Sequence, residues 1–154
     1  MLVLLPLGGG AAVAQAGAPT QGACPVTLLA LGVRGSQGSI GFVVYSSKEG
    51  WPDKYDRAFL RKATPARPGD VSVTVQLPPG RYAVALLHDE NGNKRLDRKP
   101  SGRPREGFGL SNNPKVVLKT PSFAAAALDI ACGDRVPIRV RYPSRAEDKE
   151  AQGK

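Results

Sequence analysis

The sequence is poor in the residues from which most metal and redox centres are built. It contains one histidine and two cysteines in 154 residues, which excludes a zinc finger, a multi-histidine metal site and an iron–sulfur cluster. No apolar run reaches the roughly 18–20 residues that a membrane-spanning helix needs, so no such anchor is predicted. Acidic residues are also few. They number 13 against 22 Lys and Arg, and the formal net charge is +9.

The remaining composition suits one globular domain that is rich in turns. Hydrophobic residues make up 41% of the chain, which is too many for a disordered protein. The 18 glycines and 14 prolines predict short elements separated by frequent turns. A chain of this length favours a single domain.

The first residues have the pattern of an export signal. Residues 1–16 carry no charge, and an apolar core of Leu and Val precedes several small residues. Ala14, Gln15 and Ala16 fit the small-x-small pattern that precedes a cleavage site, which predicts a mature chain that begins at Gly17. We therefore expect a periplasmic or extracellular protein. The alternative is a buried strand or helix at the N-terminus.

Export bears on how the two cysteines are interpreted. Cys24 opens the mature domain and Cys132 lies near its end. In an oxidising compartment two such thiols most often pair, so we predict a disulfide between them. Two unpaired cysteines are the alternative. A lipidated Cys24 is disfavoured because residues 21–23 lack an aliphatic side chain.

Most of the mature chain is predicted to form strands. The clearest pattern is the strict alternation of apolar and polar residues from Val71 to Leu77, which is typical of a half-buried strand. The predicted strands cover residues 26–31, 39–45, 71–77, 82–88, 115–119, 123–130 and 136–142. This pattern predicts an all-β fold, a sandwich of about seven strands that is immunoglobulin-like or transthyretin-like, over residues 17–142.

Two segments do not fit a strand pattern. Within residues 46–63, Trp51, Tyr55 and Phe59 recur at helical spacing, which predicts a crossover that contains one short helix. We expect its aromatic side chains to cover the end of the core rather than to line a ligand site. Residues 143–154 are charged and predict a flexible tail.

A short segment after the predicted strand 82–88 carries side chains that suit a cation. Oxygen-bearing residues alternate there as Asp89, Asn91 and Asn93, and Asp97 follows. Calcium takes such oxygen ligands, and the backbone carbonyl of Arg95 is a further candidate. The pattern predicts a calcium site over 89–97, and a weak one, because the surrounding cations repel a dication. The alternative is a metal-free turn in which Asp and Asn cap backbone amides.

A basic run overlaps this segment. Its six cationic side chains are Lys94, Arg95, Arg98, Lys99, Arg103 and Arg105. Such a patch attracts polyanions. For an exported protein the candidates are anionic lipid heads, lipopolysaccharide, cell-wall polymers and extracellular DNA, although no interleaved aromatic residues are present to stack on bases. The alternative is a solvated loop without a partner.

Catalytic chemistry has little support in the sequence. His88 lies at a predicted strand end, where we expect a hydrogen-bonded structural residue rather than a base. The segment around Ser111 lacks the second glycine of a nucleophile elbow. No catalytic residue is assigned, and a hydrolase that uses His88 is retained only as a third hypothesis.

Two motifs resemble a known family. The first is His88-Asp89-Glu90-Asn91-Gly92-Asn93 with Leu96-Asp97, and the second is Gly102-x-Pro104-x-Glu106-Gly107-Phe108-Gly109-Leu110-Ser111-Asn112-Asn113. Together with the preceding Leu77-Pro78-Pro79-Gly80-x-Tyr82, they are similar to the DUF2141 family of exported bacterial proteins. The resemblance covers roughly residues 26–142. It implies a small β-sandwich outside the cytoplasm and no reaction, because no activity is established for the family.

The second motif also predicts a structural contact. Residues 106–113 are rich in glycine and asparagine, which suits close backbone approach and left-handed conformations. We expect Glu106, Asn112 and Asn113 to be structural loop residues, and Asn112 or Asn113 to fold back and hydrogen-bond the 89–97 loop. The sequence as a whole predicts an exported, non-catalytic β-sandwich accessory or binding protein. Polyanion binding through residues 94–105 is the main alternative.

Overall fold

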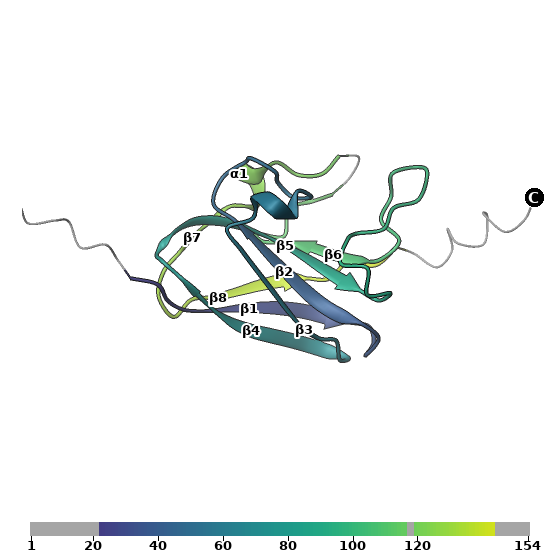
Figure 1. Cartoon of the computed structure of the whole chain (residues 1–154), viewed down its shortest axis with the longest axis horizontal. Helices are drawn as coiled ribbons and strands as arrows, with labels where there is room; N and C mark the ends of the chain where they lie inside the picture. The colour runs from purple at the N-terminus through teal and green to yellow at the C-terminus, as the bar shows by residue number, and fades with distance from the viewer. Residues whose placement is uncertain (1–21, 117–118, 144–154) are drawn as a thin grey trace, which may run out of the picture.

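A computed structural model of the chain describes residues 22–116 and 119–143. The predicted export signal at 1–16 lies outside the described residues, as does the predicted tail apart from Pro143. Figure 1 shows the strands of the described part arranged in two layers. Within that part, no helix is long and apolar enough to cross a membrane.

The strands of the described residues form two sheets that pack face to face. They are β1 (Cys24–Val33), β2 (Ser39–Tyr45), β3 (Leu60–Pro65), β4 (Gly69–Leu77), β5 (Gly80–Asp89), β6 (Gly107–Leu110), β7 (Leu128–Ile130) and β8 (Arg135–Arg139). One sheet has the order β4-β1-β8, in which β1 and β8 run parallel. The other has the order β3-β2-β5-β6, and β7 pairs with the start of β5. The predicted sandwich fold is confirmed.

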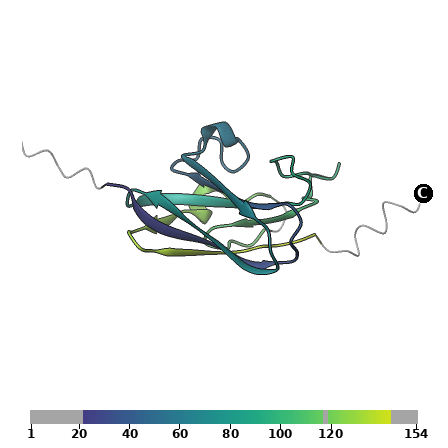
Figure 2. The same ribbon diagram turned by 60° about the horizontal axis from the view of Figure 1, so that its bottom comes forward.

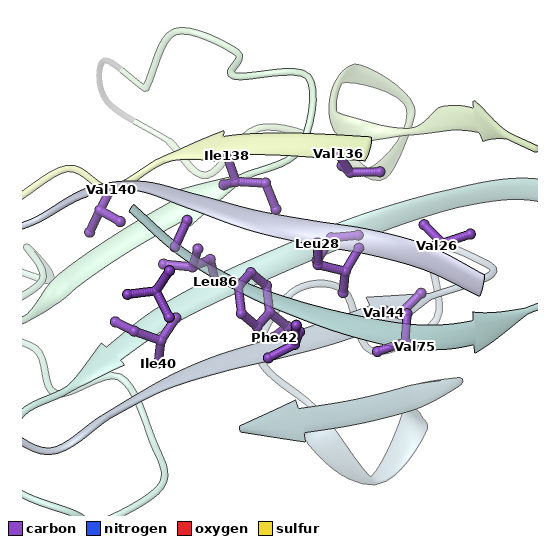
Figure 3. Packing of buried hydrophobic residues seen from close by; sticks show 14 of the residues in the cluster. Val26, Leu28, Ile40, Phe42, Val44, Val75, Leu86, Val136, Ile138 and Val140 are labelled. Atoms are coloured by element: carbon purple, nitrogen blue, oxygen red, sulfur yellow. The ribbon is translucent and has the colours of Figure 1, made fainter. Parts of the chain in front are cut away.

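The core lies between the two sheets and follows the predicted alternation. In β4, Val71, Val73 and Val75 are buried while Ser72 and Thr74 are exposed. These valines pack with inward residues of the other strands, and Figure 3 shows such a cluster. The labelled residues that fill it are Val26, Leu28, Ile40, Phe42, Val44, Val75, Leu86, Val136, Ile138 and Val140. Burial of apolar surface on this scale is the main stabilising term of the fold.

The predicted disulfide is present. Cys24, the first residue of β1, is bonded to Cys132, which follows β7, and the two lie 108 residues apart. On the chain-entropy account, a cross-link that closes a loop of about 100 residues stabilises the folded state by roughly 4–5 kcal/mol. The bond therefore joins the start of β1 to the turn between β7 and β8.

The predicted strand at 123–130 is wrong in its first half. Residues Phe123–Ala126 form the helix α1, and only Leu128–Ile130 form the strand β7. Ser122 caps the helix, because its side chain accepts a hydrogen bond from the Ala125 backbone N–H. Alanine also has the highest helix propensity, and the cap outweighs the apolar pattern that predicted a strand.

Residues around β6 were also predicted incorrectly. The described residues of the predicted strand 115–119 are irregular, and residues 117–118 lie outside the description. The strand lies earlier, at Gly107–Leu110, where the two glycines disfavoured a strand prediction. They are needed there, since a Cβ on Gly109 would lie 2.7 Å from the Arg139 carbonyl oxygen. Glycine in a strand commonly marks such a close approach.

The crossover at 46–63 contains less helix than its spacing predicts. It holds only the single-turn 3-10 helix η1 (Tyr55–Arg57), and β3 begins at Leu60. Trp51 covers the sheet as expected, with its ring 5.4 Å from that of Tyr45 and 6.1 Å from that of Phe123. Phe59 is exposed, against expectation.

Three irregular segments cover the outer face of the larger sheet. They are the crossover with η1, the loop that joins β5 to β6, and the segment around α1. Both ribbon views show η1 and the β5–β6 loop rising from the same side of the sandwich (Figures 1 and 2). The predicted calcium ligands and the six predicted basic residues lie on this side.

Candidate functional site

The site is built on the loop between two antiparallel strands. β5 ends at Asp89 and β6 begins at Gly107, and the last paired positions of the two strands are His88 and Gly107. The predicted cation ligands and all six predicted basic residues lie in this connection or at its start. Because both ends of the loop are anchored in one strand pair, its base is fixed by the sheet.

Asp89 organises the first half of the loop. Its side chain is almost completely buried, with 4% of the residue exposed. One carboxylate oxygen accepts hydrogen bonds from the backbone N–H groups of Gly92 and Asn93, and the other accepts one from Lys94 at 2.8 Å. These three amides are therefore all satisfied by one side chain. Asp89 thereby holds the chain in a tight turn.

Glu106 organises the second half. It is 5% exposed, and its two carboxylate oxygens accept hydrogen bonds from the backbone N–H groups of Glu90 and Asp97, each at 3.2 Å. Burial raises the pKa of Glu106, and these two hydrogen bonds oppose the rise. The residue joins the two ends of the loop, which agrees with its predicted structural role.

The remaining oxygen-bearing residues bind one another. The amide groups of Asn91 and Asn93 donate to the Asp97 carboxylate at 2.6 and 2.9 Å. Their own side-chain oxygens accept backbone N–H groups of Asn93 and Arg95. The hydrogen bonds from Asn91 and then Asn93 lower the pKa of Asp97. The carboxylate is therefore ionised at neutral pH.

The loop brings together four of the five predicted calcium ligands through these hydrogen bonds. The side-chain oxygens of Asp89, Asn91, Asn93 and Asp97 all accept hydrogen bonds within the loop. Among the described residues, no group of three or more His, Cys, Asp or Glu side chains is arranged to hold a metal ion. An ion bound at the Asp97 carboxylate would compete with the amide donors of Asn91 and Asn93. The calcium site, including the Arg95 carbonyl, stays a prediction.

The predicted basic residues spread over the outside of this network. Five of the six are exposed and Lys99 is half-buried. One terminal nitrogen of Arg98 donates to the Gly102 carbonyl at 3.0 Å, and the other lies 3.8 Å from the Asp53 carboxylate. These contacts hold the loop against the crossover segment.

A pocket of about 370 Å³ lies between the loop and the sheet. Its floor consists of side chains on the outer face of β2, β5 and β6. Val43 pairs with Ala85, and Ala85 pairs with Leu110 on its other side. Leu87 pairs with Phe108 one step along the same face. The floor is therefore apolar across three strands.

The wall and rim of the pocket come from three segments far apart in the sequence. The charged residues among its lining are Asp53, Arg98, Arg103 and Lys119. Tyr55 completes the wall, and its hydrogen bond with the Leu96 backbone joins η1 to the loop. Burial raises the pKa of Tyr55, so its hydroxyl stays neutral. Sequence reasoning missed the pocket, because no local pattern reports which distant segments meet over a sheet.

The comparison with known families identifies the domain. A family model described as an uncharacterized protein conserved in bacteria, DUF2141, matches residues 30–137. The chain belongs to this family. The match runs from the end of β1 into β8 and includes the whole β5–β6 loop. No curated protein and no solved structure matches the chain.

The histidine of the family-like motif is structural in this fold. His88 is fully buried, with Nδ1 2.7 Å from the Tyr142 hydroxyl and Nε2 2.8 Å from the Gln37 carbonyl oxygen. Ser111 is also fully buried, where it donates to the Ala126 carbonyl at 2.6 Å and accepts from the Val84 backbone N–H. Both side chains are buried and hydrogen-bonded to other parts of the fold, which gives the hydrolase hypothesis no support.

The predicted contact from the asparagine pair to the loop is wrong. Asn112 donates to the Ala125 carbonyl, and Asn113 donates to the Pro137 carbonyl and accepts from the Arg139 backbone N–H. Both residues adopt positive φ, at 60° and 45°, as expected for asparagine in tight turns. They tie β6 to α1 and β8, whereas Glu106 makes the contacts to the 89–97 loop.

Proposed function

We propose that this protein is an exported, non-catalytic binding module that holds anionic polymers of the cell envelope through the basic loop, residues 94–105. The observation that carries the proposal is the internal order of this loop. Asp89 and Glu106 together accept five backbone N–H groups from residues 90–97. Within the loop, the backbone N–H groups of Arg105 and Lys99 donate to the carbonyls of Asp97 and Arg103, so the cationic side chains project from a hydrogen-bonded backbone. A preorganised loop loses less conformational entropy on binding than a flexible one.

The charge of the loop supports an anionic partner. Between residues 94 and 105 there are six cations and one carboxylate, that of Asp97. The Asp97 carboxylate is occupied by the amides of Asn91 and Asn93. The cations therefore dominate the field outside the loop, and a repeated anion along a polymer gains from several of them at once.

Export is supported by two observations of different kind. The pattern of residues 1–16 is that of a signal peptide, and Cys24 and Cys132 form a disulfide. Structural disulfides persist mainly in oxidising compartments. Anionic polymers of the envelope are the partners that such a protein meets there.

The proposal is tested by salt-dependent retention on immobilised heparin and on lipopolysaccharide. A triple variant with Lys94, Arg95 and Arg105 changed to Gln should elute at lower salt than the unmodified protein, because fewer counterions are released on binding. The matched control changes three exposed cations elsewhere, Arg61, Lys62 and Arg135, to Gln. Equal elution of the two triple variants would show that net charge, and not this loop, causes retention.

Calcium binding by residues 89–97 is a finer form of the proposal. Calorimetry in millimolar calcium and in chelator measures whether the ion stabilises the fold, since a ligand that binds only the native state raises the melting temperature. The Asp97→Asn variant removes one carboxylate from the set. A rise in the unmodified protein that the variant loses supports the site, whereas equal melting temperatures remove calcium from the proposal.

A further inference from the structure

We infer that the pocket beneath the basic loop binds an anionic amphiphile, a short acyl or alkyl chain that carries a carboxylate or phosphate head. The inference goes beyond polymer binding and rests on the proposed function only in that the loop must be ordered to form one wall. The chain would lie on the apolar floor and the head at the cationic rim.

The size of the cavity suits a small ligand. Its volume of about 370 Å³ lies at the lower end of the roughly 300–1,000 Å³ typical of small-molecule sites. It is too small for a folded partner and large enough for one hydrocarbon chain. The cavity is built on rigid elements, since its floor is formed by paired positions of β2, β5 and β6.

The floor is suited to a hydrocarbon and to little else. The outer-face side chains of Val43, Ala85, Leu87 and Leu110 offer no hydrogen-bonding group. Ala85, the smallest of them, lies between Val43 and Leu110 in the strand register. Its short side chain leaves the depth of the pocket open, and a chain that covers these residues gains about 25 cal/mol for each Å² of apolar surface removed from water.

The rim selects the sign of the head group. Three cations, Arg98, Arg103 and Lys119, line the pocket, and Asp53 is the single acidic residue among the described residues of its lining. Asp53 lies beside Arg98, with 3.8 Å between carboxylate and guanidinium. The cations of the described lining outnumber its carboxylates by three to one. A carboxylate or phosphate at the mouth gains Coulomb energy, and a cationic head loses it.

The first test measures binding of decanoate below its micelle concentration, by calorimetry on the full chain with its disulfide intact. Ala85→Leu should weaken decanoate binding about tenfold or more, because the larger side chain occupies the cavity. Lys119→Gln keeps the floor intact and should weaken binding about two- to fivefold, the range of an exposed charge contact. Arg135→Gln, on the opposite sheet, is the matched control and should bind as the unmodified protein does.

Decyltrimethylammonium has the same chain with a cationic head and should bind more weakly than decanoate. Equal affinity for the two would overturn the assignment of the rim. Vesicles of phosphatidylglycerol and of phosphatidylcholine distinguish the source of the chain. Binding of the anionic vesicles that Ala85→Leu abolishes indicates a lipid in a bilayer, and binding of monomeric decanoate alone indicates a free amphiphile.

Heparin retention separates this inference from the proposed function. Ala85→Leu should leave retention unchanged, and its circular dichroism spectrum and melting temperature check that the variant is folded. If Ala85→Leu affects neither decanoate nor vesicle binding while the Lys94, Arg95 and Arg105 variant loses retention, the pocket assignment fails and polymer binding stands. If decanoate binding depends on Ala85 and retention does not depend on the loop, the pocket assignment stands and polymer binding through the loop fails.

Discussion

The imidazole Nδ1 of His88 lies 2.7 Å from the hydroxyl of Tyr142, and this pair closes one end of the sandwich. Nε2 faces the Gln37 carbonyl oxygen, which can only accept, so Nε2 carries the proton and Nδ1 accepts from the tyrosine. The same hydroxyl accepts from the Arg34 backbone N–H, and the Arg34 guanidinium lies 4.4 Å from the ring centre. One tyrosine thus joins the segment after β8 to β5 and to the end of β1.

Replacement of Tyr142 by Phe should destabilise the fold by about 1–3 kcal/mol. The change keeps the ring against Arg34 but leaves the buried Nδ1 of His88 without its donor, and an unsatisfied buried polar atom costs its full desolvation energy. Urea unfolding measures the loss. The control is Tyr82→Phe, which removes a hydrogen bond to the Pro78 carbonyl at a partly buried position. A loss at Tyr142 no larger than the control would contradict the role given to this pair.

The pair of Arg34 and Glu90 predicts a dependence of stability on pH. The hydrogen bonds from the Arg34 guanidinium hold the pKa of Glu90 below its ordinary value. A carboxyl whose folded pKa is lowered stabilises the fold fully above its unfolded pKa, near 4.3, and loses this contribution as the pH falls through the folded value. The Arg34→Gln variant lacks the guanidinium that lowers the pKa of Glu90.

The free-energy difference between the unmodified protein and Arg34→Gln should therefore be largest near neutral pH and shrink below about pH 4. Denaturant unfolding at a series of pH values measures it. The contact of Arg34 with the Tyr142 ring does not titrate in this range, so a constant residual difference is expected at low pH. A difference that is equal at all pH values would show that the ion pair adds nothing to stability.

Glu106 should control the order of the loop, although it carries no positive charge that could bind an anionic polymer. Glu106→Ala removes the acceptor for the backbone N–H groups of Glu90 and Asp97, so both amides should exchange with solvent faster. Hydrogen exchange followed by NMR measures this opening. Heparin retention should fall as well, because a mobile loop loses entropy on binding. The control is Asp129→Ala, a surface carboxylate paired with Arg81 at the start of β5, the end of the strand away from the loop.

Loss of amide protection in Glu106→Ala without any change in retention would separate the order of the loop from binding. The Glu106→Gln variant refines the test, since it keeps one side-chain oxygen as an acceptor and replaces the other by a donor. In this variant, only one of the two backbone amides, the one of Asp97 or Glu90 that faces the new donor, should lose its protection from exchange. An intermediate retention is then expected.

The strands with clear local patterns were predictable, and the elements set by distant contacts were not. β2 was predicted with its observed bounds. The apolar–polar alternation of β4 predicted a strand correctly because one face of this strand packs against the core. β6 was missed because its glycines are required by Tyr142 and Ile138, which lie far along the chain. A single sequence does not show those neighbours.

The site divides in the same way. The Asp89 turn and the disulfide follow from residue types, since aspartate caps amides and exported thiols pair. Glu106 was expected to be a structural loop residue, but the contact with the 89–97 loop was assigned to Asn112 or Asn113 instead of to Glu106. The error came from placing Asn112 and Asn113 beside the loop. These residues follow β6, whereas the loop precedes this strand. The pocket depends on three separate segments, and local reasoning could not assemble it.

Gly109 provides a test of the packing that fixes β6. A Cβ at this position would lie 2.7 Å from both the Arg139 carbonyl oxygen and the Ile138 Cγ2 atom, and a backbone oxygen cannot move aside as a flexible side chain can. Gly109→Ala should therefore cost about 1–3 kcal/mol, as overpacked substitutions do. Gly35→Ala is the control, because nothing lies within 4 Å of its Cβ. Urea unfolding compares the two, and since β6 carries part of the pocket floor, Gly109→Ala should also weaken decanoate binding. Equal stability of the two variants would mean that β6 is free to shift away from β8, and that the sheet does not fix the pocket as described.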